Sequence, residues 1–176
     1  MMQREHDFGI MPPKIAGTLE MDKNQDLEKF AKELQKQILG ELKKKYSDNV
    51  IDHWQNPRNF EKIENPDGSA KVKGSCGDTM EMFLRMKNDI VSRCTFLTDG
   101  CGTTIACGSV ATELAKNKSF TQAIAGVSAK EILKGLDGLP EDDVHCAQLA
   151  SETLRRALAD FLYKKRFPWK NHYGKT

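Results

Sequence analysis

The sequence lacks several features that would place it at once in a broad class of proteins. Its 27 basic and 25 acidic residues leave a formal net charge of +2, which excludes a strongly basic nucleic-acid-binding chain and a chain kept disordered by its own charge. No apolar run approaches the roughly 18 residues of a membrane span. The N-terminal residues include acids and lack an apolar signal core, so we expect a cytoplasmic protein that binds neither nucleic acid nor membrane.

An even number of cysteines is also missing. The sequence has five of them, and an odd number does not suit the disulfide framework of a secreted domain. The C-x2-C pairing of a zinc finger is absent as well. In a reducing cytoplasm these thiols need separate explanations, according to where each one lies: Cys76, Cys94, Cys101, Cys107 and Cys146.

What is present begins with an N-terminal extension, residues 1–45. We expect a mobile arm over 1–22 and an amphipathic helix over 25–45, because apolar residues recur there at steps of three and four among Lys and Glu. The stripe needs something to cover it, either the chain's own domain or a second copy of the chain. It consists of Leu27, Phe30, Ala31, Leu34, Ile38 and Leu42.

The centre of the chain alternates between apolar and polar residues in the manner of β-strands. The alternation is cleanest over Met80–Met86, and Asn88-Asp89 is suited to a two-residue hairpin turn. These features predict an antiparallel meander of three strands. The strands are expected over 69–74, 79–87 and 90–98.

Helical spacing dominates the remainder. Ser47 and Ser128 are candidate N-caps, and Ser128 with Glu131 matches a capping box. A Gly/Pro-bearing acidic loop over 135–144 precedes the last helix. Strands followed by helices predict an α+β fold, in which a three-stranded antiparallel sheet packs against several helices. The helices are expected over 47–55, 103–116, 119–125, 128–134 and 146–164.

Two of the five cysteines fit the predicted core. Cys94 alternates with Phe96 inside a strand, and Cys107 lies on the apolar stripe of the 103–116 helix. Free cysteine is among the most frequently buried residue types, so we interpret both as small core residues. Cys107 lies about one and a half turns from Cys101 and could face the same pocket.

The other three cysteines lie at the ends of predicted elements, where loops place functional groups. Cys76 separates two strands, while Cys101 and Cys146 lie at helix N-termini, where the helix dipole favours a thiolate. Asp78 stands two residues from Cys76, and His145 is adjacent to Cys146. Three thiolates, a carboxylate and an imidazole suit zinc or iron–sulfur chemistry. His53, by contrast, is expected to be a surface residue of a polar helix.

Four segments resemble the IscU-type (NifU N-terminal) iron–sulfur cluster assembly scaffold family. One is the opening segment and three contain the cysteines discussed above, in the family's order and spacing. The resemblance covers about residues 46–165, between the extension 1–45 and a basic C-terminal tail, 166–176. The segments are Tyr46–Asn59, Gly74–Asp78, Asp99–Ala106 and His145-Cys146.

The resemblance implies a function that the spacing alone does not. Cys76, Cys101 and Cys146 match the family's cluster ligands, Asp78 matches the carboxylate that makes the cluster labile, and His145 matches a histidine near the cluster. The protein would accept sulfur from a cysteine desulfurase, with Cys146 as persulfide acceptor, build a [2Fe–2S] cluster and pass it to apo-proteins. It would be a scaffold or carrier and not an enzyme. Family members can also be isolated with zinc.

The chain departs from the family pattern before the last His-Cys pair. The usual Leu-Pro-Pro-Val-Lys is here Leu139–Asp143, with the lysine replaced by Asp143. That loop docks a dedicated Hsp70-type chaperone in the family, so the change argues against chaperone dependence. We also expect an acid so close to Cys146 to raise the pKa of its thiol. Cys107 stands where the family has a small hydroxyl residue.

Two alternatives use the same residues. A zinc-bound SufU-like sulfur acceptor would stimulate a desulfurase, but the 45-residue step from Cys101 to Cys146 lacks the insertion typical of that group. A thiol enzyme would need His145 to act as base for Cys146. Adjacent residues rarely point at each other, and no third orienting group is evident, so we place this alternative last.

Overall fold

The computed structural model describes residues 18–169, with side chains described from Asp26 onward. The chain separates into two compact units, Met1–Glu41 and Leu42–Thr176, which are considered individually below. Most of the predicted mobile arm lies outside the described residues. In the described part of the chain, no helix is both long enough and apolar enough to cross a membrane.

The three predicted strands form one antiparallel sheet in the order β1-β2-β3. Asn88 and Asp89 both have positive φ, 52° and 62°, as the predicted tight turn between β2 and β3 requires. The register shifts between Arg85 and Met86, just before this turn. The α+β class and the meander are therefore confirmed. The strands are β1 (Gly68–Lys73), β2 (Thr79–Lys87) and β3 (Ile90–Thr98).

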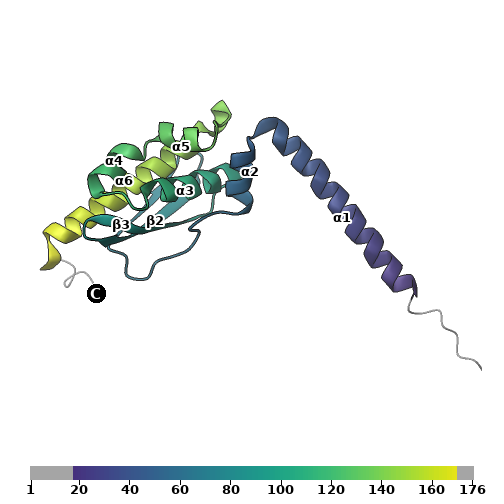
Figure 1. Cartoon of the computed structure of the whole chain (residues 1–176), viewed down its shortest axis with the longest axis horizontal. Helices are drawn as coiled ribbons and strands as arrows, with labels where there is room; N and C mark the ends of the chain where they lie inside the picture. Colours follow the sequence, from purple (N-terminus) through teal and green to yellow (C-terminus); the bar gives the residue numbers. More distant parts are fainter. Residues whose placement is uncertain (1–17, 170–176) are drawn as a thin grey trace, which may run out of the picture. The chain divides into compact units, whose positions relative to one another are not determined.

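Two long helices cover one face of this sheet (Figure 1). They are α3 (Gly102–Ala115), which packs against β3, and α6 (Val144–Arg166), which crosses β1 and β2. Shorter helices pack around this pair, and a 3₁₀ turn interrupts the predicted acidic loop. These are α2 (Asp48–Gln55), α4 (Phe120–Gly126), α5 (Ala129–Gly135) and η1 (Glu141–Asp143).

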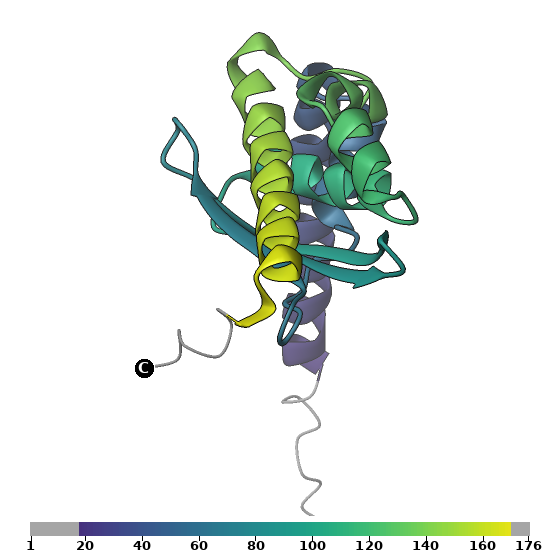
Figure 2. The same cartoon turned by 90° about the vertical axis from the view of Figure 1, so that its left-hand side faces the viewer.

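The core lies between the sheet and the two long helices, and Figure 2 shows these two layers from the side. Met80, Met82 and Leu84 point into it from β2 and are fully buried, as their alternation predicts. The opposite face of the sheet is crossed by the segment between α2 and β1, from which Ile63 is buried. Arg85 holds this segment in place by donating hydrogen bonds to main-chain oxygens of Glu64 and Asn65.

The helix starts follow local capping chemistry. Ser47 and Ser128 accept hydrogen bonds from the main-chain N–H groups three residues later, as predicted. The complete reciprocal capping box, however, is formed by Ser119 and Gln122 at the start of α4. Both patterns are Ser-x-x-Glu/Gln. The sequence motif therefore predicts the N-cap, but it does not predict whether the Glu or Gln side chain accepts a hydrogen bond from the main-chain N–H of the cap residue.

The N-terminal helix is longer than predicted. Helix α1 spans Thr18–Lys45, so it begins seven residues before the expected start, and residues 18–22, expected in the mobile arm, are helical. The apolar stripe begins only at Leu27, which is why hydrophobic periodicity did not reveal the first two turns. Three lysines form its last turn, where cations complement the helix dipole.

Candidate functional site

Three cysteines from three separate elements approach one another at one end of the helix pair. Cys76 lies in the turn between β1 and β2, Cys101 is the N-cap of α3, and Cys146 is in the first turn of α6. Cys76 and Cys101 are exposed, whereas Cys146 is buried. The charges of Cys76 and Cys101 both act on the Cys146 thiol, which places the three sulfurs in one electrostatic neighbourhood.

Glycines shape the loops that carry these thiols. Gly77 has a φ of +95°, a conformation that only glycine adopts without strain, and it turns the chain between Cys76 and Asp78. A Cβ on Gly100 would lie 2.5 Å from the Asp78 carboxylate, so only glycine lets the two loops meet. Gly77 therefore permits the turn after Cys76, and Gly100 permits the loop before Cys101 to approach Asp78.

Asp78 joins the strand turn to the start of α3. Its Oδ2 accepts a hydrogen bond of 2.7 Å from the Thr104 hydroxyl and lies 3.4 Å from the main-chain nitrogen of Cys101. The Thr104 hydroxyl also lies 3.3 Å from the sulfur of Cys146. Because this hydroxyl has one proton, it donates either to the carboxylate or to the thiol at any moment. Asp78, Cys101 and Cys146 are thus connected through one threonine.

Cys101 has the environment of a thiolate. Burial alone would raise the pKa of its thiol, but hydrogen bonds from the side chains and main-chain N–H groups of Thr103 and Thr104 outweigh burial and lower the pKa. The Thr103 oxygen lies 3.0 Å from the sulfur. The lowered pKa predicted for a helix N-terminus is therefore correct for Cys101.

For Cys146 the lowered pKa expected at a helix N-terminus is wrong, because its pKa is raised. Burial is the largest influence on its thiol and raises the pKa, and the hydrogen bonds from Thr104 and Thr103 only partly offset burial. The charges of Cys101 and Cys76 raise the pKa further. A position at a helix start was therefore insufficient to predict a thiolate, because the cost of burying the charged form outweighs the influences that favour it.

The pKa of Cys146 is raised, as expected for a thiol so close to an acid, and Asp143 also makes contacts that the sequence did not reveal. Its carboxylate accepts a hydrogen bond of 3.0 Å from the Tyr46 hydroxyl and lies 3.7 Å from the Lys45 ammonium. Burial is the largest cause of the raised pKa of Cys146, and the charge of Asp143 contributes to the raised pKa of Cys107.

His145 does face its neighbour. Its Nε2 lies 3.5 Å from the Cys146 sulfur, contrary to our expectation that adjacent side chains point apart. This contact brings an imidazole nitrogen to the same site as the thiols. The imidazole has the chemistry to serve as a further ligand.

The remaining two cysteines are core residues, as predicted. Cys94 is 2% exposed, and burial raises its pKa to about 12. Cys107 is fully buried, and burial raises the pKa of its thiol as well, with smaller contributions from Cys146 and Cys101. Both thiols are therefore neutral at physiological pH and poorly suited to nucleophilic attack.

The thiols are gathered but not yet in a metal-binding arrangement. Across the residues whose side chains are described, no three Cys, His, Asp or Glu groups stand close enough to hold a metal ion. The Thr103 and Thr104 hydroxyls occupy the space between the sulfurs of Cys101 and Cys146. Rotation of the cysteine side chains away from these hydroxyls would be needed for them to share an ion or a cluster.

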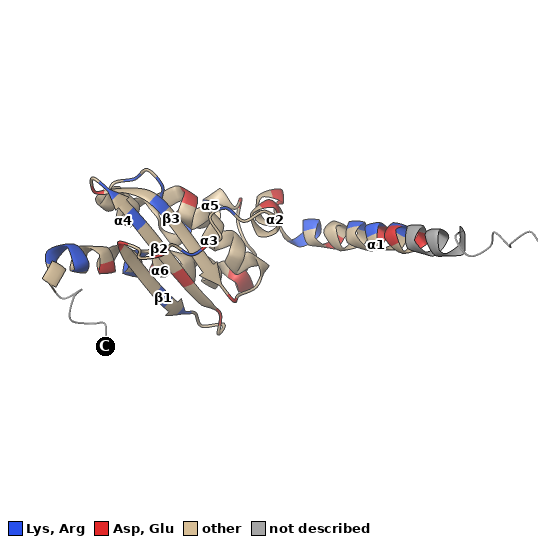
Figure 3. Cartoon of the chain, turned by 90° about the horizontal axis from the view of Figure 1, so that it is seen from below, with Lys and Arg blue, Asp and Glu red and all other residues tan. Residues whose placement is uncertain are grey.

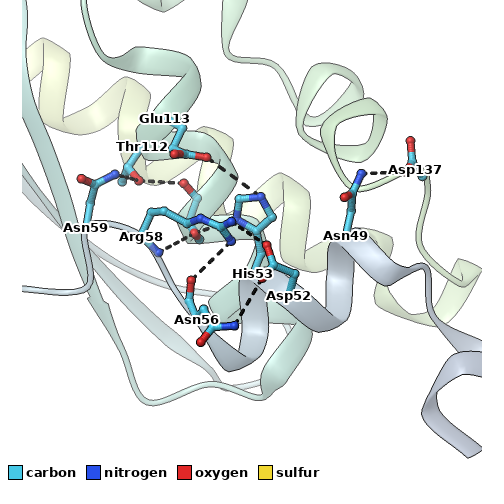
Figure 4. Close-up of polar contacts among 10 residues, drawn as sticks. Asn49, Asp52, His53, Asn56, Arg58, Asn59, Thr112, Glu113 and Asp137 are labelled. Carbon is cyan, nitrogen blue, oxygen red and sulfur yellow. Dashed lines mark hydrogen bonds and ion pairs between the residues drawn. The ribbon is translucent and has the colours of Figure 1, made fainter. Parts of the chain in front are cut away.

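A polar network anchors α3 from the side facing α2 (Figure 4). His53 is not the surface residue we expected, because its side chain is 12% exposed and its Nδ1 lies 2.8 Å from the Ser109 hydroxyl. Burial lowers the pKa of His53. The main-chain N–H of Arg58 donates to the same hydroxyl, and the Arg58 guanidinium pairs with Asp52. A buried serine on the far helix was the missing partner that sequence spacing could not reveal.

A second set of contacts holds the segment that leads to Cys146. Ser47 donates a hydrogen bond of 2.6 Å to the Leu136 carbonyl, and Asn49 donates one of 2.7 Å to Asp137 (Figure 4). Tyr46 reaches Asp143 at the other end of the same segment. In the structure the acidic loop comprises Leu136–Asp143, because Gly135 ends α5 and Val144 begins α6. These contacts hold the acidic loop against the start of α2. The loop itself ends two residues before His145.

Comparison with known proteins places this arrangement among relatives. Residues 45–167 match the family model described as the NifU-like N terminal domain. The iron–sulfur cluster assembly scaffold protein IscU 1 of Archaeoglobus fulgidus is 42% identical over 120 residues, which cover 68% of this chain and 78% of that protein. The scaffold protein IscU of Escherichia coli K12 is 38% identical over 125 residues, covering 68% and 96%.

Solved structures share the fold. A protein from Fervidobacterium islandicum AW-1, titled as an assembly scaffold for the SUF system, superimposes with a TM-score of 0.57 at 23% identity and covers 64% of this chain and 96% of that one. A NifU-like N-terminal protein from Brucella abortus gives a TM-score of 0.54 at 17% identity, covering 67% and 94%. At these identities the likeness is one of fold alone.

Proposed function

The chain belongs to the NifU-like N-terminal domain family of iron–sulfur cluster assembly scaffolds, and from that premise we propose that it builds a labile [2Fe–2S] cluster and passes it to apo-proteins. The proposed ligands are Cys76, Cys101 and Cys146, with Asp78 and His145 close to the cluster. The iron and sulfide are cargo, so the protein acts as a carrier and not as an enzyme. Its proposed partners are a cysteine desulfurase and the recipient proteins.

One observation carries this proposal. Thiols from three segments that lie far apart in the sequence meet at one end of the fold, and Asp78 and His145 come with two of them. A packing role explains buried cysteines such as Cys94, but it does not explain two exposed cysteines beside a carboxylate. Thiolate, carboxylate and imidazole form a donor set suited to an iron–sulfur cluster.

We propose that the sulfur arrives at Cys146. The Cys146 thiolate would attack the outer sulfur of the desulfurase persulfide, so that a new S–S bond forms while the old one breaks and the desulfurase cysteine leaves as a thiolate. Converting each transferred sulfur to sulfide then takes two electrons from an external reductant. Burial of Cys146 sets a condition for this step, because the groups that cover the sulfur have to move before a desulfurase can reach it.

Asp78 is proposed to keep the cluster labile. A carboxylate binds iron less tightly than a fourth thiolate would, and the Asp78 carboxylate already has competing donors in Thr104 and the Cys101 main chain. A cluster held by three thiolates and this carboxylate can therefore be assembled and still be released.

The test is reconstitution of the full chain with iron and sulfide under anaerobic conditions. We expect a visible charge-transfer spectrum with about two irons and two sulfides per cluster. Replacing Cys76, Cys101 or Cys146 by Ala should reduce retained cluster at least tenfold, whereas Cys94→Ala should retain it because Cys94 lies in the core. A colourless protein that instead keeps one tightly bound zinc would contradict cluster assembly and favour a zinc-bound sulfur acceptor.

A further inference from the structure

Helix α1 carries an apolar stripe whose large described side chains are exposed. Among its described side chains, Leu27 and Phe30 are each 66% exposed, Leu34 is 45% exposed and Ile38 is 51% exposed. These exposures contrast with the core side chains of the scaffold domain, which are almost completely covered. A helix that gains no tertiary packing for its apolar face is marginal in water. The stripe therefore calls for a partner.

The stripe runs nearly straight along the helix. Leu27 and Ile38 are eleven residues apart, as are Ala31 and Leu42, and eleven residues make three turns at a spacing close to the 3.6 residues of an ordinary helix. A second helix can therefore follow the stripe without strong supercoiling. The 28 residues of α1 extend for about 42 Å, so a partner helix of the same length would match it throughout.

Charge is distributed unevenly along α1. The first half, 18–31, contains four acids and two lysines, whereas the second half, 32–45, contains two acids and five lysines. Figure 3 shows the lysines concentrated in the last turns, which lead into α2. The helix thus has a negative half and a positive half, and it is self-complementary only when two copies run in opposite directions.

We propose that α1 pairs with α1 of a second copy in an antiparallel arrangement, so that the chain is a dimer held together outside its scaffold domain. In this arrangement the acidic half of each helix faces the lysine-rich half of the other, and the apolar stripes meet near Leu34. Parallel pairing would place acids against acids and lysines against lysines. This proposal does not depend on cluster assembly.

Association is measured on the full chain by analytical ultracentrifugation over a range of concentrations. We expect a concentration-dependent dimer of twice the 19.8 kDa chain mass. Raising the salt concentration from 50 to 500 mM should weaken the dimer severalfold, because it screens the attraction between opposite halves. A monomer at all concentrations would overturn the proposal, and a dimer strengthened by salt would overturn the antiparallel pairing of opposite charges.

Matched substitutions identify the surface. Leu34→Gln and Ile38→Gln remove apolar area while keeping a residue with good helix propensity, and together they should raise the dimer dissociation constant at least tenfold. Lys36→Gln lies on the opposite side of the helix and should change it less than threefold. Far-UV circular dichroism checks that each variant keeps its helix. A dimer unaffected by the double substitution would place the interface elsewhere and overturn the proposal.

Orientation is tested by carbodiimide cross-linking, which joins a carboxylate directly to an amine. A mixture of nitrogen-15-labelled and unlabelled chains identifies links between two copies by mass spectrometry. Antiparallel pairing should link Asp26 or Glu28 of one copy to Lys43 of the other. In a parallel pair these residues are separated by about 22–26 Å along the helices, so links confined to residues at equal heights would overturn the antiparallel arrangement.

Discussion

The starts of α3 and α6 each carry a proposed ligand cysteine, yet the pKa values of the two thiols are shifted in opposite directions. Cys101 is exposed and has a lowered pKa, whereas Cys146 is buried and has a raised pKa. Both sulfurs contact the same two threonine hydroxyls. The difference shows that the balance between burial and hydrogen bonds to the sulfur decides which thiol is ready to react, and that a position at a helix start does not decide it alone.

The two helix starts also differ in how they are anchored. The start of α3 is held by Asp78 from the strand turn, and Gly102 packs directly against the Trp54 ring. The start of α6 instead follows the acidic loop, which is held through the side chains of Ser47, Asn49 and Tyr46. The α3 start is therefore anchored directly, while the α6 start is anchored through the segment that precedes it.

The largest expected effect compares the two thiols directly. In the apo-protein at pH 7.5, Cys101 should react with iodoacetamide about 100-fold faster than Cys146, since Cys146 reacts only when its surroundings open. Peptide mass spectrometry after timed quenching gives both rates in one sample. Denatured protein supplies the control, because the two rates should then converge. Similar rates in the native protein would contradict the comparison.

A smaller effect should follow from removing the shared hydroxyl. Thr104→Val keeps the side-chain shape but removes a hydrogen-bond donor to Cys101, so the pKa of Cys101 should rise. Loss of about 1 kcal/mol of hydrogen bonding corresponds to a fall of about fivefold in the thiolate fraction at pH 7.5.

The measurement for this variant is the pH dependence of Cys101 alkylation, whose midpoint should move to higher pH. Thr153→Val is the matched control, because Thr153 is also buried but donates to the Leu149 carbonyl within α6. An unchanged midpoint in Thr104→Val would show that the Thr103 hydroxyl and the main-chain N–H groups suffice to lower the pKa of Cys101.

The smallest effect concerns the anchor of the acidic loop. Asn49→Ala removes the contact with Asp137, so the loop should open more often and Cys146 should be alkylated about threefold faster, with Cys101 unchanged. Asn56→Ala is the control, since Asn56 donates only to Asp52 near its own helix. Equal acceleration of both cysteines would indicate general loosening of the fold instead of release of the loop.

Much of the fold followed from local sequence signals. Alternation predicted the strands, Asn88-Asp89 predicted the turn, and Ser47 predicted the start of α2 to within one residue. These features depend on residues close together in the chain, so the sequence states them directly. The early start of α1 was missed because its first two turns lack an apolar stripe.

The residues of the candidate site were selected from the sequence, but their electrostatics were only partly predicted from it. Position at element ends and the family resemblance selected Cys76, Cys101 and Cys146, and the ligand roles remain proposals. The raised pKa of Cys146 and the buried contact of His53 depend on partners contributed by other elements. So does the pairing of Asp143 with Tyr46, which are 97 residues apart. Such contacts exist only after the chain has folded.

The spacing of the three thiols would let the proposed cluster stabilise the fold. Cys76 and Cys101 are 25 residues apart, and Cys101 and Cys146 are 45 apart, so a bound cluster would close two loops of chain. A covalent cross-link over loops of this size removes about 3–4 kcal/mol of chain entropy from the unfolded state. A loaded carrier would thus resist unfolding more than an empty one. Transfer of the cluster would remove this cross-link, so the free energy of unfolding of the protein would be lower after each transfer than before it.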